Sequence, residues 1–175
     1  KVTDEGCDDD KDGYCDSAIF TVGPVGSVKA CVNGGADCVD DNDKINPGAI
    51  EICNSINDNC VLGADEGCDD DKDGYCDGKM VVVGIPISCP LTTGASTKDC
   101  NDDVSQINPK ATEVCNDIDD NCSLGADEGC DKDQDGYCDK DMTVIGKPKI
   151  CAKTVSGTTV DCNDDNGAVN PGATE

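Results

Sequence analysis

One stretch of ten residues occurs three times in this chain, almost unchanged, at 7–16, 68–77 and 130–139. The first copy reads Cys-Asp-Asp-Asp-Lys-Asp-Gly-Tyr-Cys-Asp, so aspartates alternate ahead of a glycine and two cysteines bracket them. Oxygen ligands at alternate positions, followed by a glycine that permits a sharp turn, are typical of a loop that wraps a calcium ion. The sequence therefore predicts an array of cation-binding loops.

The rest of the chain repeats with the same period as this loop. The tetrapeptide Asp-Glu-Gly-Cys returns about every 60 residues, as expected for a tandem array, and its copies begin at Asp4, Asp65 and Asp127. We expect three domains: repeat 1 at 1–64, repeat 2 at 65–126 and an incomplete repeat 3 at 127–175. Because the chain opens and closes within a repeat, we expect a continuation of the same array or a homo-oligomer whose subunits complete one another.

Apolar side chains are too sparse to form one large core. Aromatic residues make up 2% of the 175 residues, whereas cysteines number 16. Such a cysteine density is typical of small domains whose disulfides persist in an oxidising compartment. We therefore predict a secreted, extracellular or cell-surface protein of small, disulfide-rich, calcium-stabilised repeats. The fold should be mostly irregular, with short β-strands in the β-branched runs at 18–22, 79–83 and 142–145.

The cysteines are expected to pair within each repeat. The two complete repeats hold six cysteines each, and the incomplete third holds four, so the number is even in all three. Six cysteines permit 15 connectivities, among which we predict Cys7–Cys15, Cys31–Cys38 and Cys53–Cys60 in repeat 1. Zinc is disfavoured, because the chain has no histidine and no Cys-x-x-Cys pair, and carboxylates flank the thiols.

Acidic side chains dominate the charge of the chain, with 38 Asp and Glu against 13 basic residues and a net charge of -25. Nucleic acids and anionic membranes are bound through clusters of basic residues, so neither is an expected partner. No apolar run approaches the ~20 residues of a transmembrane helix, so no membrane insertion is expected. The expected partners are cations, above all calcium ions.

Counting from the first aspartate of each loop gives a partial calcium-binding pattern. Positions 1, 3, 5 and 9 carry aspartates, position 6 is glycine, and position 7 is a tyrosine whose carbonyl is a candidate ligand. Position 12, a bidentate glutamate in an EF-hand, is apolar here, so another part of the fold must supply that ligand. A solvated acidic turn is the alternative, but two carboxylates ~4 Å apart repel by about 4 kcal/mol at an effective dielectric of about 20. The candidate ligands are Asp8, Asp10, Asp12, Tyr14, Asp16, Asp69, Asp71, Asp73, Tyr75, Asp77, Asp131, Asp133, Asp135, Tyr137 and Asp139.

A second acidic block, later in each repeat, is expected to complete these sites or to build adjoining ones. It contains Asp-Cys-x-Asp-Asp and ends in a glutamate at position 12 counted from its second aspartate. The alternative is a proline turn that leads into a helix with a glutamate in its first turn. The candidate ligands are Asp37, Asp40, Asp41, Glu51, Asp99, Asp102, Asp103, Glu113, Asp161, Asp164, Asp165 and Glu175.

A third block places oxygen donors across the junction between repeats. A calcium ion there would stiffen the linkage, whereas the alternative is ordinary asparagine-rich turn chemistry. The candidate ligands are Asn57, Asn59, Asp65, Glu66, Asp119, Asn121, Asp127 and Glu128.

Several motifs follow one another in a fixed order: Asp-Cys-x-Asp-Asp, Asn-Pro-Gly-Ala-x-Glu-x-Cys-Asn, Asn-Asp-Asn-Cys, Asp-Glu-Gly-Cys and Asp-x-Asp-x-Asp-Gly-Tyr. This ordered set covers almost the whole chain and resembles the metal-binding repeat of MopE-type bacterial surface proteins. The aspartate loop alone is also similar to the calcium loops of thrombospondin type 3 and dockerin modules. The resemblance implies secreted, repeat-built, calcium-binding proteins that are often modules of larger surface proteins.

Copper is associated with one namesake of that family, but it is not expected here. Copper requires soft or imidazole donors, and this chain has no histidine and no tryptophan. The chain also departs from the family pattern in Val39 and Val61, where acids are usual, and in the additional Cys15, Cys76 and Cys138. These cysteines indicate that disulfides replace part of the metal bonding.

The expected function is structural rather than enzymatic. The chain has no histidine, no arginine and no nucleophile motif, and loops saturated with ligands leave no open position on a metal. Calcium would neutralise much of the negative charge and let acidic units approach one another. We therefore predict a rigid rod, a head-to-tail filament or a cell-surface fibre; the alternative is an adhesion or cation-buffering module of a larger surface protein.

Overall fold

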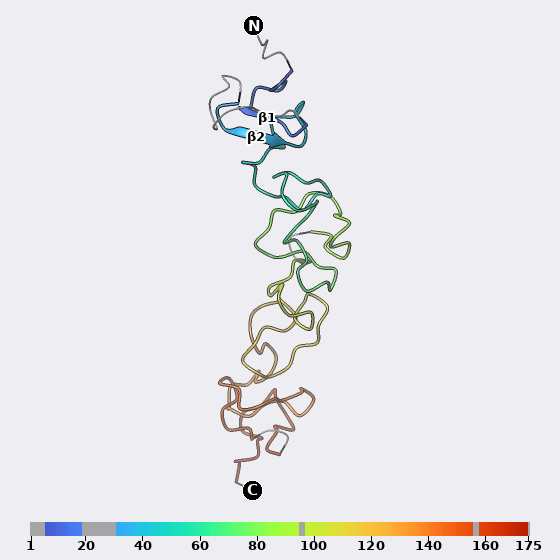
Figure 1. Cartoon of the computed structure of the whole chain (residues 1–175). Coiled ribbons are helices and arrows are strands. Elements are labelled where there is room, and N and C mark those ends of the chain that lie inside the picture. Colours follow the sequence, from blue (N-terminus) through green and yellow to red (C-terminus); the bar gives the residue numbers. More distant parts are fainter. Residues whose placement is uncertain (1–5, 19–30, 95–96, 156–157, 175) are drawn as a thin grey trace. The chain divides into compact units, whose positions relative to one another are not determined.

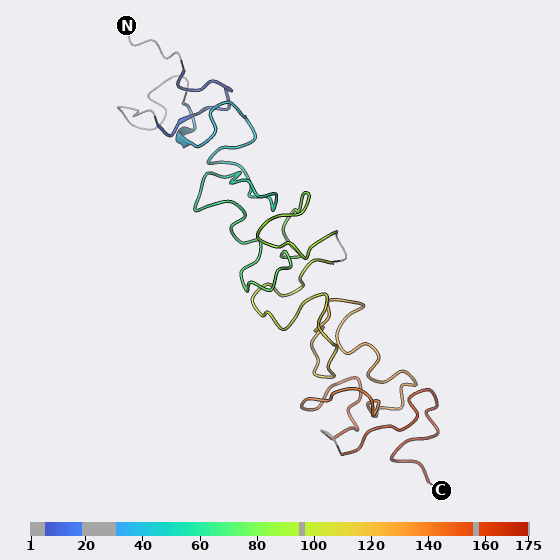
Figure 2. The ribbon, with the colours of Figure 1, turned by 90° about the vertical axis from the view of Figure 1, so that its right-hand side faces the viewer.

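The computed structural model describes residues 6–18, 31–94, 97–155 and 158–174. Two strands occur in these ranges, β1 (Tyr14–Asp16) and β2 (Gly34–Asp37), and they pair in parallel with a register shift between Cys15 and Asp16 (Figure 1). Elsewhere the described chain forms turns and irregular loops, as a second view also shows (Figure 2). The predicted class of small, disulfide-rich, mostly irregular repeats with short strands is confirmed. Nowhere in these ranges is there a helix of the length and apolar character needed to cross a membrane.

The positions of the strands differ from the prediction. The run at 79–83 contributes one isolated β-bridge, Val82 with Cys53, and the run at 142–145 contributes the corresponding bridge of Val144 with Cys115. Side chains alternate along these runs: Met80 and Val82 pack on buried cysteines, whereas Val81 and Val83 are exposed. The runs therefore cover disulfides instead of building a sheet. The remaining predicted strand, at 18–22, lies almost entirely outside the described residues.

Two compact units divide the chain, Lys1–Thr93 and Gly94–Glu175. Every disulfide of the described residues joins two cysteines of the same unit, so each unit is crosslinked internally. The division follows spatial contacts and does not test the three sequence repeats, which stay a prediction.

The predicted disulfide connectivity is wrong, and so is the expectation that the cysteines pair within each repeat, because Cys53–Cys68 and Cys115–Cys130 cross the predicted repeat boundaries. The observed pairs are Cys15–Cys31, Cys38–Cys60, Cys53–Cys68, Cys76–Cys89, Cys100–Cys122, Cys115–Cys130 and Cys138–Cys151. The aspartate loop needs no disulfide across its own ends, because a backbone hydrogen bond from Asp77 N–H to the Cys68 carbonyl (3.0 Å) closes it. Its two cysteines instead link the loop to the segment before it and the segment after it.

The core of each unit consists of paired disulfides. In the first unit, two disulfides bury all four of their cysteines, with Met80 and Val82 packed against them. In the second unit, Met142 and Val144 pack against the four corresponding cysteines. A buried threonine hydroxyl completes each core: Thr92 Oγ1 accepts a hydrogen bond of 2.6 Å from Cys76 N–H, and Thr154 does the same for the second unit. Sulfur and a few aliphatic groups thus replace the usual apolar core.

The Asn-Pro-Gly turn of the first unit fits closely against Tyr14. A methyl group at Gly48 would overlap the tyrosine Oη and lie 3.2 Å from Cζ. We expect Gly48→Ala to displace the tyrosine ring and to lower the free energy of unfolding by about 1 kcal/mol, the low end of the cost of overpacking. Denaturant unfolding measures this change.

Two variants control for the intrinsic effect of alanine. At Gly63 an added methyl group meets nothing within 4 Å, so Gly63→Ala should be nearly neutral. Tyr14→Phe removes the hydroxyl, so Gly48→Ala should cost less in that background. An equal cost in both backgrounds would contradict the proposed contact.

Candidate metal centre

The aspartate loop is shaped by hydrogen bonds from its own backbone. One oxygen of Asp10 accepts from Asp12 N–H (3.1 Å), and one oxygen of Asp12 accepts from Tyr14 N–H (2.7 Å). The other oxygens, Asp10 Oδ2 and Asp12 Oδ2, are buried and have no hydrogen-bond partner among the described residues, as is also true of Asp8 Oδ1. Ligand atoms of these three carboxylates lie within 4.8 Å of one another, and the same holds for Asp69, Asp71 and Asp73. In Asp10 and Asp12, one oxygen orients the loop, and the other has no hydrogen-bond partner among the described residues and is a candidate cation ligand.

The second acidic block brings a fully buried carboxylate to this loop. Asp37 ends β2 and pairs with Asp16 of β1, and its side chain is 0% exposed. Its Oδ1 accepts a hydrogen bond from Val39 N–H (2.9 Å), whereas Oδ2 has no hydrogen-bond partner in the described chain. Burial raises the pKa of Asp37, and the negative charges of Asp12 and Asp10 act in the same direction. Asp37 of the second block therefore lies beside the loop of the first repeat, and the prediction that this block supplies metal ligands stays a prediction.

Asp40 is a further carboxylate of the second block that interacts with acidic residues of the first loop. Burial raises its pKa, and so do the charges of Asp9 and Asp16, while the backbone amide of Asp9 donates a hydrogen bond to it. Its Oδ1 is buried without a hydrogen-bond partner in the described part of the chain. The neighbouring Asp41 is exposed, as are its counterparts Asp103 and Asp165.

The third repeat has the same arrangement. Asp161 is 0% exposed and forms a β-bridge with Asp139; its Oδ1 accepts from Asn163 N–H (2.9 Å), and Oδ2 has no hydrogen-bond partner within the described ranges. Both oxygens of Asp131 accept loop amides, from Asp135 and Gly136, and burial raises its pKa. Burial also raises the pKa of Asp69 in the second loop. In the second unit, Asp99 and Asp102 are likewise buried.

The glutamates predicted at position 12 bind the backbone of their own unit. Glu51 Oε2 accepts from Asp58 and Asn59 N–H (3.0 and 3.2 Å), and Oε1 accepts from Asp65 N–H (3.0 Å). Glu113 makes the corresponding three bonds, and burial raises its pKa. These carboxylates anchor loops, so we leave them out of the candidate centre. Glu175 lies outside the described residues.

The oxygens of the third block fall into two groups: some accept hydrogen bonds from backbone amides, and others have no hydrogen-bond partner among the described residues. Asp65 Oδ1 accepts from the Asn54 and Ser55 amides, and Asp127 does the same one repeat later. The Asn59 and Asp119 side chains accept from nearby amides. By contrast, four buried oxygens have no hydrogen-bond partner in the described chain: Asn57 Oδ1, Glu66 Oε2, Asn121 Oδ1 and Glu128 Oε2. Ligation by this block, and by the tyrosine carbonyls, stays a prediction.

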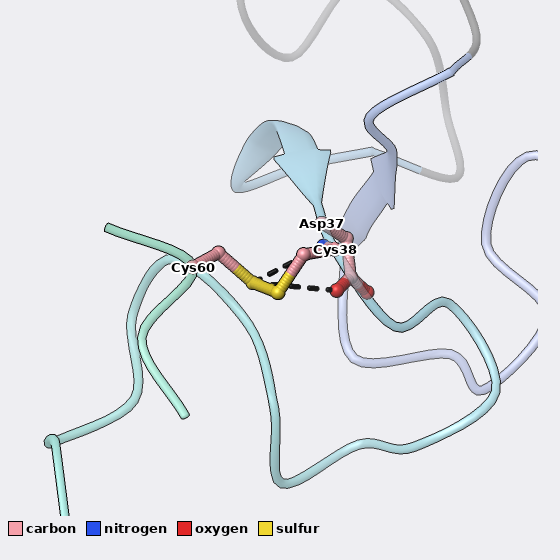
Figure 3. Close-up of side chains that lie close together, drawn as sticks. All are labelled: Asp37, Cys38 and Cys60. Atoms are coloured by element: carbon pink, nitrogen blue, oxygen red, sulfur yellow. Dashed lines mark hydrogen bonds between the residues drawn. A yellow bond between two sulfur atoms is a disulfide. The ribbon is translucent and has the colours of Figure 1, made fainter. Parts of the chain in front are cut away.

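The cysteines of the second block in the first two repeats are not thiolate ligands. Cys38 and Cys60 are joined in a disulfide, Cys38 N–H donates to Cys60 Sγ (3.1 Å), and Asp37 Oδ1 lies 3.9 Å from that sulfur (Figure 3). The Cys100–Cys122 disulfide lies in the same way beside Asp99. A disulfide sulfur lacks the negative charge with which a thiolate binds soft metals. In the first two repeats the donors that remain are therefore oxygens, whereas Cys162, beside Asp161 in the third repeat, is a free and exposed cysteine.

One residue that contacts the carboxylates of the third repeat, Lys132, was not predicted from the sequence. Its ammonium nitrogen lies 3.6 Å from Asp139 Oδ2 and 3.4 Å from Asp164 Oδ2, inside the acidic group of the third repeat. The available signal was a break in the pattern: the first two loops carry aspartate at this position, Asp9 and Asp70.

These features define the class of the protein: disulfide-stabilised repeats, each with a cluster of oxygen donors suited to a cation. The family model Cu-binding_MopE, described as "Putative metal-binding motif", matches residues 37–60, 99–128 and 161–175. The predicted resemblance to the MopE-type repeat is thereby confirmed, and the matched segments identify a metal-binding module. The likeness of the aspartate loops to thrombospondin type 3 and dockerin loops stays a prediction. No curated protein and no solved structure matches the chain.

Proposed function

We propose that this chain is a calcium-binding structural module of an extracellular repeat protein. The observation that carries the proposal is Asp37, a fully buried carboxylate whose Oδ2 has no hydrogen-bond partner among the described residues and which is acted on by the charges of Asp10 and Asp12. A buried ionised group is costly unless it is paired or coordinates a metal. A cation among these oxygens would remove both the desolvation cost and the mutual repulsion.

Calcium is the cation that this donor set favours. Carboxylate and carbonyl oxygens in an irregular loop suit the six to eight flexible ligands of Ca²⁺, whereas Mg²⁺ requires a tight octahedron and retains its waters. The family model is named for copper, but copper prefers imidazole and soft sulfur donors. Histidine is absent from the sequence, and in the first two repeats the cysteines of the second block, Cys38 and Cys100, form disulfides.

The structural role rests on crosslinking and charge. The seven disulfides among the described residues support an oxidising, extracellular location, since cytosolic reductants would break them. Calcium would offset part of the net charge of -25 and allow acidic repeats to form a stiff rod or filament. The proposed role is not catalytic, because ions enclosed by protein ligands have no open position for a substrate.

Calorimetric titration of the oxidised, chelator-treated chain tests the metal. We expect Ca²⁺ to bind at several sites and to stabilise the fold by about 2.7 kcal/mol at a concentration 100 times its Kd. Mg²⁺ and Cu²⁺, titrated under the same conditions, should bind more weakly. Tighter binding of Cu²⁺, or an unfolding curve that Ca²⁺ does not shift, would refute the calcium assignment.

Sedimentation and electron microscopy, with Ca²⁺ and with EDTA, test the rod or filament. Assemblies that form with Ca²⁺ and disappear with EDTA are expected. A chain that binds Ca²⁺ and stays monomeric would favour the adhesion or cation-buffering alternative.

A further inference from the structure

Lys132 places a positive charge between two carboxylates of the third repeat. Its ammonium lies 3.4 Å from Asp164 Oδ2 and 3.6 Å from Asp139 Oδ2, and its own backbone amide donates to Asp164 Oδ1 (3.1 Å). The Asp164 side chain is 5% exposed and that of Asp139 16%, whereas the lysine side chain is 55% exposed. Lys132 therefore contacts both oxygens of a buried carboxylate: its backbone amide donates to Oδ1, and its ammonium forms an ion pair with Oδ2, which has no hydrogen-bond partner among the described residues.

The first repeat has the same backbone contact without the positive charge. There the second position of the loop is Asp9, whose amide donates to Asp40, the counterpart of Asp164. The charges of Asp9 and Asp16 both act on Asp40. Three carboxylates therefore stand in the first repeat where the third repeat has two carboxylates and an ammonium.

We propose that Lys132 is a built-in counter-cation that partly replaces calcium in the third repeat, so that this repeat binds Ca²⁺ more weakly than the first. The inference rests on the proposed calcium-binding function. An incoming ion must displace the ammonium from Asp139 and Asp164, and any ammonium that remains nearby repels it. Because the lysine stem is exposed, displacement into solvent is sterically open. The array therefore contains sites of graded affinity.

Tyrosine-sensitised terbium luminescence can report on single repeats in the full oxidised chain. The chain has three tyrosines and no tryptophan, and each tyrosine follows a loop glycine. With Tyr14→Phe and Tyr75→Phe, Tyr137 reports the third repeat; with Tyr75→Phe and Tyr137→Phe, Tyr14 reports the first. Ca²⁺ then competes with bound Tb³⁺, which gives a calcium affinity for each repeat.

Removing the charge should strengthen binding in the third repeat. We expect Lys132→Gln to raise its calcium affinity by at least about fivefold, and Lys132→Asp, which restores the residue of the other loops, by at least about tenfold. Lys140→Gln is the matched control, because Lys140 lies in the same repeat but pairs with the exposed Asp141. Its effect should stay within about twofold. Circular dichroism and non-reducing peptide maps verify that all variants fold alike.

The inference is overturned if Lys132→Gln leaves the affinity unchanged, if Lys140→Gln changes it equally, or if Tyr137 never sensitises Tb³⁺ in the Lys132→Asp chain. In these cases calcium binding reported by Tyr14 in the first repeat would leave the proposed function standing. Absence of calcium competition in both repeats would instead refute the proposed function itself.

Discussion

Asp37→Asn is expected to lower the calcium affinity of the first repeat by at least about a hundredfold without destabilising the calcium-free protein. Asparagine keeps the Oδ1 that accepts from Val39 N–H, so the local turn is preserved. It removes the negative charge and replaces Oδ2, which has no hydrogen-bond partner among the described residues, with an amide group that cannot bind a cation. Terbium competition reported by Tyr14 measures the affinity, and denaturant unfolding in EDTA measures the stability.

The pH dependence of the stability of the calcium-free protein provides a second test of the Asp37 carboxylate. Burial, together with the charges of Asp12 and Asp10, raises the pKa of Asp37, so the folded state takes up a proton more readily than the unfolded chain. The contribution of Asp37 to the free energy of unfolding should therefore rise as the pH falls through its folded pKa toward its unfolded pKa, and its full penalty is present above the folded pKa. Asp37→Asn should flatten this rise.

Two further substitutions serve as controls for Asp37→Asn. Asp161→Asn changes the equivalent buried carboxylate and should act on the third repeat only. Asp43→Asn changes an exposed carboxylate paired with Lys44 and should leave every affinity unchanged. If Asp37→Asn instead unfolds the protein in EDTA and leaves the calcium affinity of the folded fraction intact, the carboxylate is structural and the proposed centre is wrong.

Removing the buried Cys53–Cys68 disulfide is expected to cost about 4 kcal/mol, enough to abolish or nearly abolish cooperative folding of the first unit. The bond has a sequence separation of 15, and closing such a loop contributes about 3 kcal/mol in the chain-entropy model. Both cysteines are 0% exposed and belong to the sulfur-rich core, so replacement by alanine also leaves a cavity. Thermal unfolding of Cys53→Ala/Cys68→Ala in saturating Ca²⁺ measures the loss.

The Cys38–Cys60 disulfide separates the effect of crosslinking from the effect of burial. It has a longer sequence separation, 22, but Cys38 is exposed and the bond lies outside the buried cluster. Chain entropy alone predicts a slightly larger cost for Cys38→Ala/Cys60→Ala. We expect a smaller one, because no core is lost. A larger cost would show that disulfide burial does not stabilise this fold.

Much of the candidate centre could be predicted from local sequence. Alternate aspartates before a glycine turn their side chains into one loop, as Asp8, Asp10 and Asp12 do, because their spacing sets the geometry. The need for a ligand from the second block also followed from the pattern, since position 12 of each loop is apolar. The fold class followed from many cysteines and few aromatics.

Only the tertiary structure decided the disulfide partners, the role of each carboxylate and the position of the Lys132 ammonium. Cysteines pair across separations of 13 to 22 residues, and any partner at such a distance is equally compatible with the sequence pattern. Glu51 and Asp37 are both buried acids, but the first accepts backbone amides with both oxygens while the second keeps one oxygen without a hydrogen-bond partner in the described chain. Residue type shows that a group can bind a cation; whether backbone amides already occupy its oxygens depends on which segments the fold brings together.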